Sequence, residues 1–301
     1  MSAYMMTVSI TIGIYVILAI SLNIITGYAG QISLGHAAFF GIGAYASGML
    51  ATRLGAPFFV CLPFAIVVTG IVGAILGIPC LRVREDFLAI TTMGINFVVQ
   101  AVFLYVPFFG GALGISNIPV PSLGGVEMTK PAYLAMVILF ILLAIGIDGW
   151  LTRSWTGLAL SAIREDETAA EMSGVNLTRF KVIAFVLGSA MAGLAGSLYA
   201  HFMSFISATD FGFSESIVIL SMVVFGGIGT LRGPIIGAII LGVAPELFRP
   251  ILDYRTLLYG VMLVVLMRFQ PQGLLGIDSF FIRHIKRLWR KEVSREAPAE
   301  N

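Results

Sequence analysis

The first 52 residues, MSAYMMTVSITIGIYVILAISLNIITGYAGQISLGHAAFFGIGAYASGMLAT (1–52), contain no charged side chain. Further uncharged runs occupy 54–81, 87–126, 132–147 and 182–209. A helix needs about 20 mostly apolar residues to cross a hydrocarbon layer of about 30 Å, and the longer runs exceed that length. A soluble protein could not bury several such segments in its core. The chain is therefore predicted to be an integral membrane protein.

The composition agrees with this class. The chain is 58% hydrophobic and only 11% charged, with a mean hydropathy of +0.98, whereas about 25% of the residues in a soluble domain are charged. The N-terminus lacks the basic region of a cleavable signal, and its apolar run is longer than the 7–15 residues or so of a signal core. Backbone N–H and C=O groups in lipid must form hydrogen bonds within the protein, which leaves only helices and closed barrels. No segment alternates apolar and polar residues as the strands of a barrel do. We expect an all-α polytopic protein.

Nine spans are predicted, within a range of eight to ten, because two glycine-rich segments (32–52 and 226–240) could be broken or re-entrant helices. The spans are expected at 4–26, 32–52, 57–80, 87–108, 131–149, 180–203, 213–230, 233–248 and 254–270. Basic residues concentrate on one side of them, which marks the cytoplasmic side. Only Arg53, Lys130, Arg249 and Arg255 fall on the other side. The N-terminus is thus expected outside and the C-terminus inside.

The expected organisation is a single transmembrane domain over 1–280 and a basic cytoplasmic tail over 281–301. One internal loop interrupts the apolar pattern, WLTRSWTGLALSAIREDETAAEMSGVNLTRFK (150–181), and it carries eight charged residues. The part from Gly157 to Gly174 has no proline and is rich in Ala, Leu and Glu, which favours one helix. A charged internal helix in such a protein is typical of a contact with a partner outside the bilayer, although a solvated connector remains the alternative.

Two faces of this predicted helix are distinct. Arg164, Glu167 and Glu171 share one face by their spacing. A small apolar stripe on the adjacent face consists of Ala159, Ile163 and Ala170.

Polar side chains inside the spans are candidates for a solute path, because they are costly to place in lipid. The fourth span carries a stripe of Thr92, Asn96 and Gln100. A second group surrounds a predicted break at 27–36 and consists of Asn23, Gln31, Ser33 and His36. Uncharged hydrogen-bonding groups suit a neutral or zwitterionic solute. Hydrogen bonding between helices is the equally weighted alternative, at about 0.6 kcal/mol per contact.

The glycine cluster of Gly226, Gly227, Gly229 and Gly233 is interpreted as a site of helix packing or a helix break. A phosphate-binding loop would need GxxxxGK[ST], which the chain lacks, so any ATP is expected to be hydrolysed by another chain.

Metal, cofactor and disulfide chemistry are not expected either. Cys61 and Cys80 lie at opposite ends of one predicted span, too far apart for a disulfide. His36 and His201 lack further ligands at a suitable spacing.

Four segments resemble the permease subunits of branched-chain amino acid ABC importers, and in particular the M-type member of the permease pair. These are GYAGQISLGHAAFFGIGAYASGMLA (27–51), AIREDETAAEMSGVNLTRFKVIAF (162–185), VVFGGIGTLRGPIIGAII (223–240) and YGVMLVVLMRFQPQGLLG (259–276). They cover most of the chain in the family's order. The resemblance implies a transport subunit of the bacterial inner membrane that is not an enzyme, with ATP hydrolysis in separate subunits.

The resemblance also implies partners: a second homologous permease, two ATP-binding subunits and an extracytoplasmic solute-binding protein, with no nucleic acid. A coupling helix at about 159–174 would dock on an ATP-binding subunit. Its candidate residues are Arg164, Glu165, Asp166, Glu167, Ala169, Ala170, Glu171 and Gly174. Importers of this class usually carry Glu-Ala-Ala here, whereas this chain has Thr168 in place of the Glu, so the acidic role falls to Glu167 or Glu171.

Three other functions stay open. Permeases of urea or short-amide importers are very similar, so the solute could be an amide in place of leucine, isoleucine or valine. A free-standing ion-coupled carrier would need charged residues inside the spans, but Asp148, Asp210, Glu215 and Glu246 all fall near predicted span ends. An intramembrane enzyme would need a nucleophile with a base or a metal cluster, and neither pattern is present in the sequence.

Overall fold

The computed structural model describes residues 3–80, 85–123 and 126–247, together with a few isolated positions between 260 and 274. The ninth predicted span, at 254–270, and the basic tail at 281–301 therefore lie outside the described residues or are described only at isolated positions.

Helices make up almost all of the described chain. The long ones are α1 (Ala3–Leu22), which continues as the π-helix η1 (Asn23–Tyr28), then α2 (His36–Leu54), α3 (Phe58–Cys80), α4 (Glu85–Tyr105), α5 (Lys130–Arg153), α8 (Leu177–Met203), α9 (Phe213–Gly226) and α10 (Arg232–Leu247). Two short helices, α6 (Trp155–Glu165) and α7 (Glu167–Met172), connect α5 to α8. The remaining elements are the 3₁₀ turns η2 (Pro107–Phe109), η3 (Gly111–Leu113) and η4 (Ala208–Phe211) and four strands of two residues each.

The strands belong to the connections rather than to a sheet core. β1 (Ile115–Ser116) pairs antiparallel with β4 (Phe205–Ile206), and so ties the loop after α4 to the end of α8. β2 (Ser122–Leu123) and β3 (Val126–Glu127) form a second antiparallel pair within that loop.

Helix α8 is the central helix of the bundle, in contact with α1, α2, α3, α6 and α7. Its glycines allow the neighbouring backbones to approach closely. A Cβ at Gly196 would lie 2.2 Å from the carbonyl oxygen of Phe40 in α2, and one at Gly43 would lie 2.4 Å from the Cα of Gly193. Larger residues at these positions would force α2 and α8 apart.

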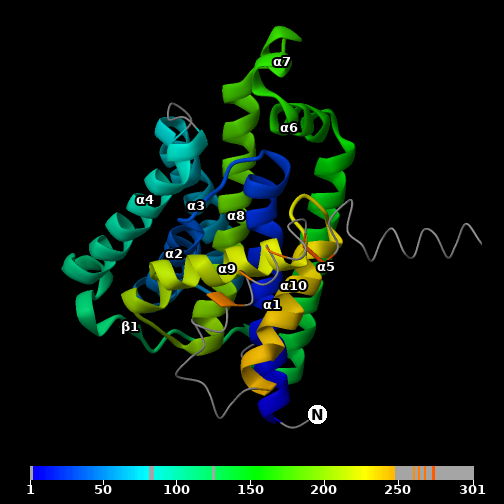
Figure 1. Ribbon diagram of the computed structural model, residues 1–301. Coiled ribbons are helices and arrows are strands. Elements are labelled where there is room, and N and C mark those ends of the chain that lie inside the picture. Colours follow the sequence, from blue (N-terminus) through cyan, green and yellow to red (C-terminus); the bar gives the residue numbers. More distant parts are fainter. Residues whose placement is uncertain are drawn as a thin grey trace, which may run out of the picture.

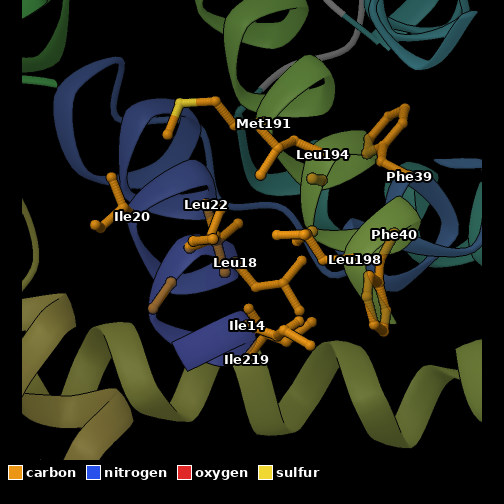
Figure 2. Packing of buried hydrophobic residues seen from close by; sticks show 14 of the residues in the cluster. Ile14, Leu18, Ile20, Leu22, Phe39, Phe40, Met191, Leu194, Leu198 and Ile219 are labelled. Atoms are coloured by element: carbon orange, nitrogen blue, oxygen red, sulfur yellow. The ribbon is translucent and has the colours of Figure 1, made fainter. Parts of the chain in front are cut away.

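The apolar core lies between α1, α8 and α9. Figure 2 shows Leu18 and Leu22 of α1 beside Leu194 and Leu198 of α8, with Ile219 of α9 below them. All five side chains are buried. Figure 1 shows α9 running across the bundle, at a steep angle to α1 and α8. This crossing helix brings the start of α9 close to α4 and the start of α2.

Eight of the nine predicted spans correspond to described helices, but the count of nine crossings is not established. Five helical segments are long and apolar enough to cross a membrane by length and composition: Ala3–Tyr28, Phe58–Ile78, Phe87–Tyr105, Lys130–Arg153 and Leu177–Met203. Two shorter apolar helices are Phe213–Gly226 and Arg232–Ala244. Several boundaries also differ from the predicted ones, since α2 starts at His36 and α4 ends at Tyr105, just before Pro107, which disfavours a helical residue ahead of it.

Candidate functional site

The polar loop at 150–181 forms two helices, so the prediction of a single helix from Gly157 to Gly174 is wrong. Asp166 has extended backbone angles (φ −158°, ψ 110°) between α6 and α7. Its carboxylate accepts a hydrogen bond from the Ala169 backbone N–H at 3.0 Å. Asp is strongly preferred at such a helix N-cap, and this local hydrogen bond competes with continuation of the helix.

The other ends of this segment are also capped. The Ser154 hydroxyl caps α6 by accepting from the Gly157 N–H at 3.3 Å, and Asn176 caps α8 by accepting from the Arg179 N–H at 3.0 Å. Gly174 adopts a left-handed φ of +83° after α7, which suits a residue without a side chain. We call Trp155–Met172 the coupling segment, after the role that the family resemblance implies for it. It lies at the end of the molecule opposite the N-terminus (Figure 1).

The apolar stripe of the coupling segment faces the protein. Ala159, Ile163 and Ala170 are each at most 4% exposed. Glu165, Asp166 and Glu171 are exposed on the outer side, together with Met172, which is 85% exposed. Trp155 and Leu158 of the same segment are 75% and 62% exposed. The segment therefore presents acidic groups and three large apolar side chains to its surroundings.

Arg164, Glu167 and Glu171 do not form the common face that their spacing predicted, because the break at Asp166 redirects them. Arg164 Nη1 donates a hydrogen bond to the Gly27 carbonyl oxygen at 2.6 Å. Glu167 forms an ion pair with Lys181 of α8. Glu171 stays exposed. Of the two acids proposed to replace the usual Glu of the family, Glu171 is the exposed one, whereas Glu167 is half-buried and paired with α8.

The chain does break near 27–36. The π-helix ends at Tyr28, and α2 begins only at His36. Asn23 bridges this break to the loop after α9, because its side chain donates to the Thr230 carbonyl at 3.2 Å and accepts from the Gly229 N–H at 2.9 Å. This amide therefore joins two segments that are far apart in the sequence.

The polar stripe of α4 also binds helix ends. Thr92 Oγ1 accepts from the Leu34 N–H at 3.0 Å. Asn96 donates to the Phe211 carbonyl at 3.4 Å and accepts from the Ser216 hydroxyl at 3.3 Å. These bonds connect α4 to the starts of α2 and α9.

Gln100, the third member of the stripe, is half-buried. A Cβ at Gly212 would lie 3.2 Å from its Nε2, which places the amide beside the turn that leads into α9.

The remaining polar groups of the 27–36 break are buried with unused hydrogen-bonding capacity. Gln31 is 3% exposed, and Ser33 and His36 are fully buried. His36 Nε2 lies 2.6 Å from the Ser21 hydroxyl. Among the described residues, Gln31 Oε1, Ser33 Oγ and His36 Nδ1 have no hydrogen-bond partner, and such groups are uncommon in protein interiors.

The glycine cluster separates α9 from α10. Gly227 and Gly229 have positive φ angles of +126° and +78°. A Cβ at Gly226 would lie 1.8 Å from the carbonyl oxygen of Gly233. The close turn therefore needs glycine both for its backbone angles and for the contact between the two helices.

One buried charged group lies where the sequence predicted a span end. Asp148 is fully buried within α5, and this helix continues to Arg153, beyond the predicted end at 149. The Tyr28 hydroxyl donates to Asp148 Oδ2 at 2.8 Å. The tyrosine partner lies 120 positions away in the sequence and could not be inferred from spacing. In the described part of the chain, no group of three His, Cys, Asp or Glu side chains could hold a metal ion.

Comparison with known proteins settles the family. Residues 4–267 match the model of the family described as "Branched-chain amino acid transport system / permease component". The chain belongs to this permease family. No solved structure matches it.

Individual relatives of this permease agree with the family assignment. It is 37% identical over 287 residues to the high-affinity branched-chain amino acid transport system permease protein LivM of Salmonella typhimurium, covering 87% of this chain and 68% of the relative. The LivM protein of Escherichia coli is 37% identical over the same lengths. The LivH permease protein of Salmonella typhimurium is 28% identical over 290 residues, covering 87% of this chain and 91% of the relative. The resemblance to M-type permeases is therefore confirmed.

Proposed function

We propose that this permease is the membrane-spanning subunit of an ATP-driven importer for branched-chain amino acids. The observation that supports this most is the family match over 4–267, together with relatives whose names state branched-chain amino acid transport. ATP is hydrolysed by two partner subunits. A second homologous permease completes the membrane part, and an extracytoplasmic protein delivers the solute. The N-terminus lies outside and the C-terminus in the cytoplasm of a bacterial inner membrane.

The coupling segment is the surface that meets an ATP-binding subunit. Its outer side carries Glu165, Asp166 and Glu171, and these are accompanied by the exposed side chain of Met172. Acidic groups around an exposed apolar anchor are typical of a docking surface. Ala169, at the start of α7, is also exposed and lets the partner approach the helix backbone closely.

The solute passes between the broken and crossing helices. His36 is the first residue of α2, and Gln31 and Ser33 lie in the break before it. Their unused hydrogen-bonding groups suit a zwitterion that sheds its water inside the membrane. The uncharged stripe of α4 holds the ends of α2 and α9 in place around this path.

Uptake of labelled leucine by cells that lack only this chain tests the function. We expect high-affinity uptake to be lost in these cells and restored when the chain is supplied again. The strain must have no other leucine importer. Unchanged leucine uptake in such a strain would contradict the assignment of leucine, and the same cells would then be tested with urea.

A further inference from the structure

Arg164 occupies a slot made by three glycines. Its Nη1 donates to the Gly27 carbonyl oxygen at 2.6 Å. A Cβ at Gly229 would lie 1.9 Å from the same nitrogen, and a Cβ at Gly30 would lie 3.3 Å from Arg164 Cγ. Gly30 and Gly229 both have positive φ angles. The backbone on both sides of the guanidinium is therefore shaped for this side chain, although the residue as a whole is exposed.

The slot joins three parts of the permease. Arg164 comes from α6 of the coupling segment, Gly27 and Gly30 lie at the break between α1 and α2, and Gly229 lies in the loop between α9 and α10. The break and the loop are also bound to each other, because Asn23 accepts from the Gly229 N–H at 2.9 Å. The arginine is thus the link from the coupling segment to two helix breaks that are already fastened together.

The second helix of the coupling segment is attached elsewhere. Glu167 of α7 pairs with Lys181 of α8, and α8 is the central helix of the bundle. Both short helices pack on α8, but their polar contacts differ. Glu167 of α7 pairs with the central helix, whereas Arg164 of α6 binds the break before the polar groups at 31–36.

We infer that Arg164 is a positioning residue that passes the movement of the coupling segment to the helix breaks around the solute path, rather than a contact for the ATP-binding subunit. This inference rests on the proposed function. The guanidinium connects α6 directly to the backbone at the two breaks. Without this connection, the non-helical residues 29–35 would bend when α6 moves, and the helices around the solute path would stay in place. ATP would then still be hydrolysed, but the path would not open and close with it.

The test uses the complete transporter, purified and reconstituted into vesicles, and compares three variants with the wild type. Arg164→Gln removes the charge, Arg164→Lys keeps it, and Arg179→Gln removes an exposed arginine of the same loop as a matched control. The measured quantities are subunit assembly, ATP hydrolysis and the amount of leucine taken up per ATP hydrolysed.

We expect Arg164→Gln to assemble and hydrolyse ATP normally while its uptake per ATP falls severalfold. Arg164→Lys should recover part of the loss, and Arg179→Gln should match the wild type. Normal uptake per ATP in Arg164→Gln would overturn the inference, as would a loss of assembly that is equal in the Gln and Lys variants. A wild-type transporter that hydrolyses ATP without taking up leucine would instead refute the proposed function.

A covalent link provides a second measurement. A Cβ at Gly30 would lie 3.5 Å from the Cβ of Arg164, within the range of about 3.5–4.5 Å found in disulfides. Gly30→Cys and Arg164→Cys are combined in a chain whose Cys61 and Cys80 are replaced by serine. We expect oxidation to raise uptake per ATP above that of the reduced form, and a reductant to reverse the gain. Formation of the disulfide with no gain, or with a further loss, would overturn the inference. Arg164→Cys alone should not respond to oxidation.

Discussion

Replacing Gly193 by alanine adds a methyl group at the junction of α2, α3 and α8. The added Cβ would lie 2.5 Å from Thr69 Oγ1, 2.7 Å from Thr69 Cβ and 2.9 Å from the Ala65 carbonyl oxygen. Rotation of the Thr69 side chain cannot relieve the contact, because its Cβ, which does not move on rotation, is nearly as close as its hydroxyl oxygen. Helix α3 would have to move outward by about 1 Å to restore ordinary van der Waals separations.

Overpacking of this kind typically costs about 1–3 kcal/mol, whereas the higher helix propensity of alanine returns up to about 1 kcal/mol. Gly94→Ala is the matched control, since Gly94 lies within α4 and a Cβ there meets no heavy atom within 4 Å in this chain. Both substitutions gain the same helix propensity, that of alanine over glycine. The difference between them is therefore the packing cost alone.

Thermal unfolding of the two purified variants in detergent measures this difference. For a packing cost of about 2 kcal/mol, the Tm of Gly193→Ala should lie about 3 °C below that of Gly94→Ala. Equal Tm values in the two variants would refute the close packing of α8 against α3. A lower Tm in Gly94→Ala than in Gly193→Ala would do the same.

Three further substitutions test the polar contacts. Asn96→Leu leaves the Phe211 carbonyl without this amide donor and the Ser216 hydroxyl without its acceptor. The free energy of unfolding should therefore fall by about 1–3 kcal/mol, measured by thermal unfolding. An unchanged Tm with an altered KM for leucine would instead favour direct contact between Asn96 and the solute. Tyr28→Phe removes the hydroxyl that binds the buried Asp148 and should lower stability by a similar amount, and an unchanged Tm would contradict this pairing. Glu171→Lys should leave the Tm unchanged while reducing capture of the ATP-binding subunits severalfold in a pull-down, and wild-type capture would exclude Glu171 from the docking surface.

Much of the architecture was predictable because lipid imposes a strict length and polarity on each spanning helix. The predicted spans located eight described helices, and the glycine-rich segments marked the breaks before α2 and after α9. Helix ends were less accurate, since they depend on single capping groups. The carboxylate of Asp166 divides the coupling segment in two, although the composition of that segment favours one continuous helix.

The candidate site was only partly accessible from the sequence. In a single helix, Arg164, Glu167 and Glu171 would share one face. The non-helical Asp166 instead places them in three different surroundings. The pairs between Tyr28 and Asp148 and between Asn23 and Gly229 join residues more than 100 positions apart. Periodicity within one helix carries no information about such contacts, so they follow only from the way the helices pack.

Accumulation of labelled leucine in vesicles is the measurement that tests the central claim most directly. The vesicles contain this permease, its homologous partner and the ATP-binding subunits, with the solute-binding protein on the outside and ATP enclosed. Leucine should accumulate when ATP is present, and no accumulation should occur without ATP or when the ATP-binding subunits are catalytically inactive. Accumulation by this chain alone, driven by an ion gradient without ATP, would contradict the account.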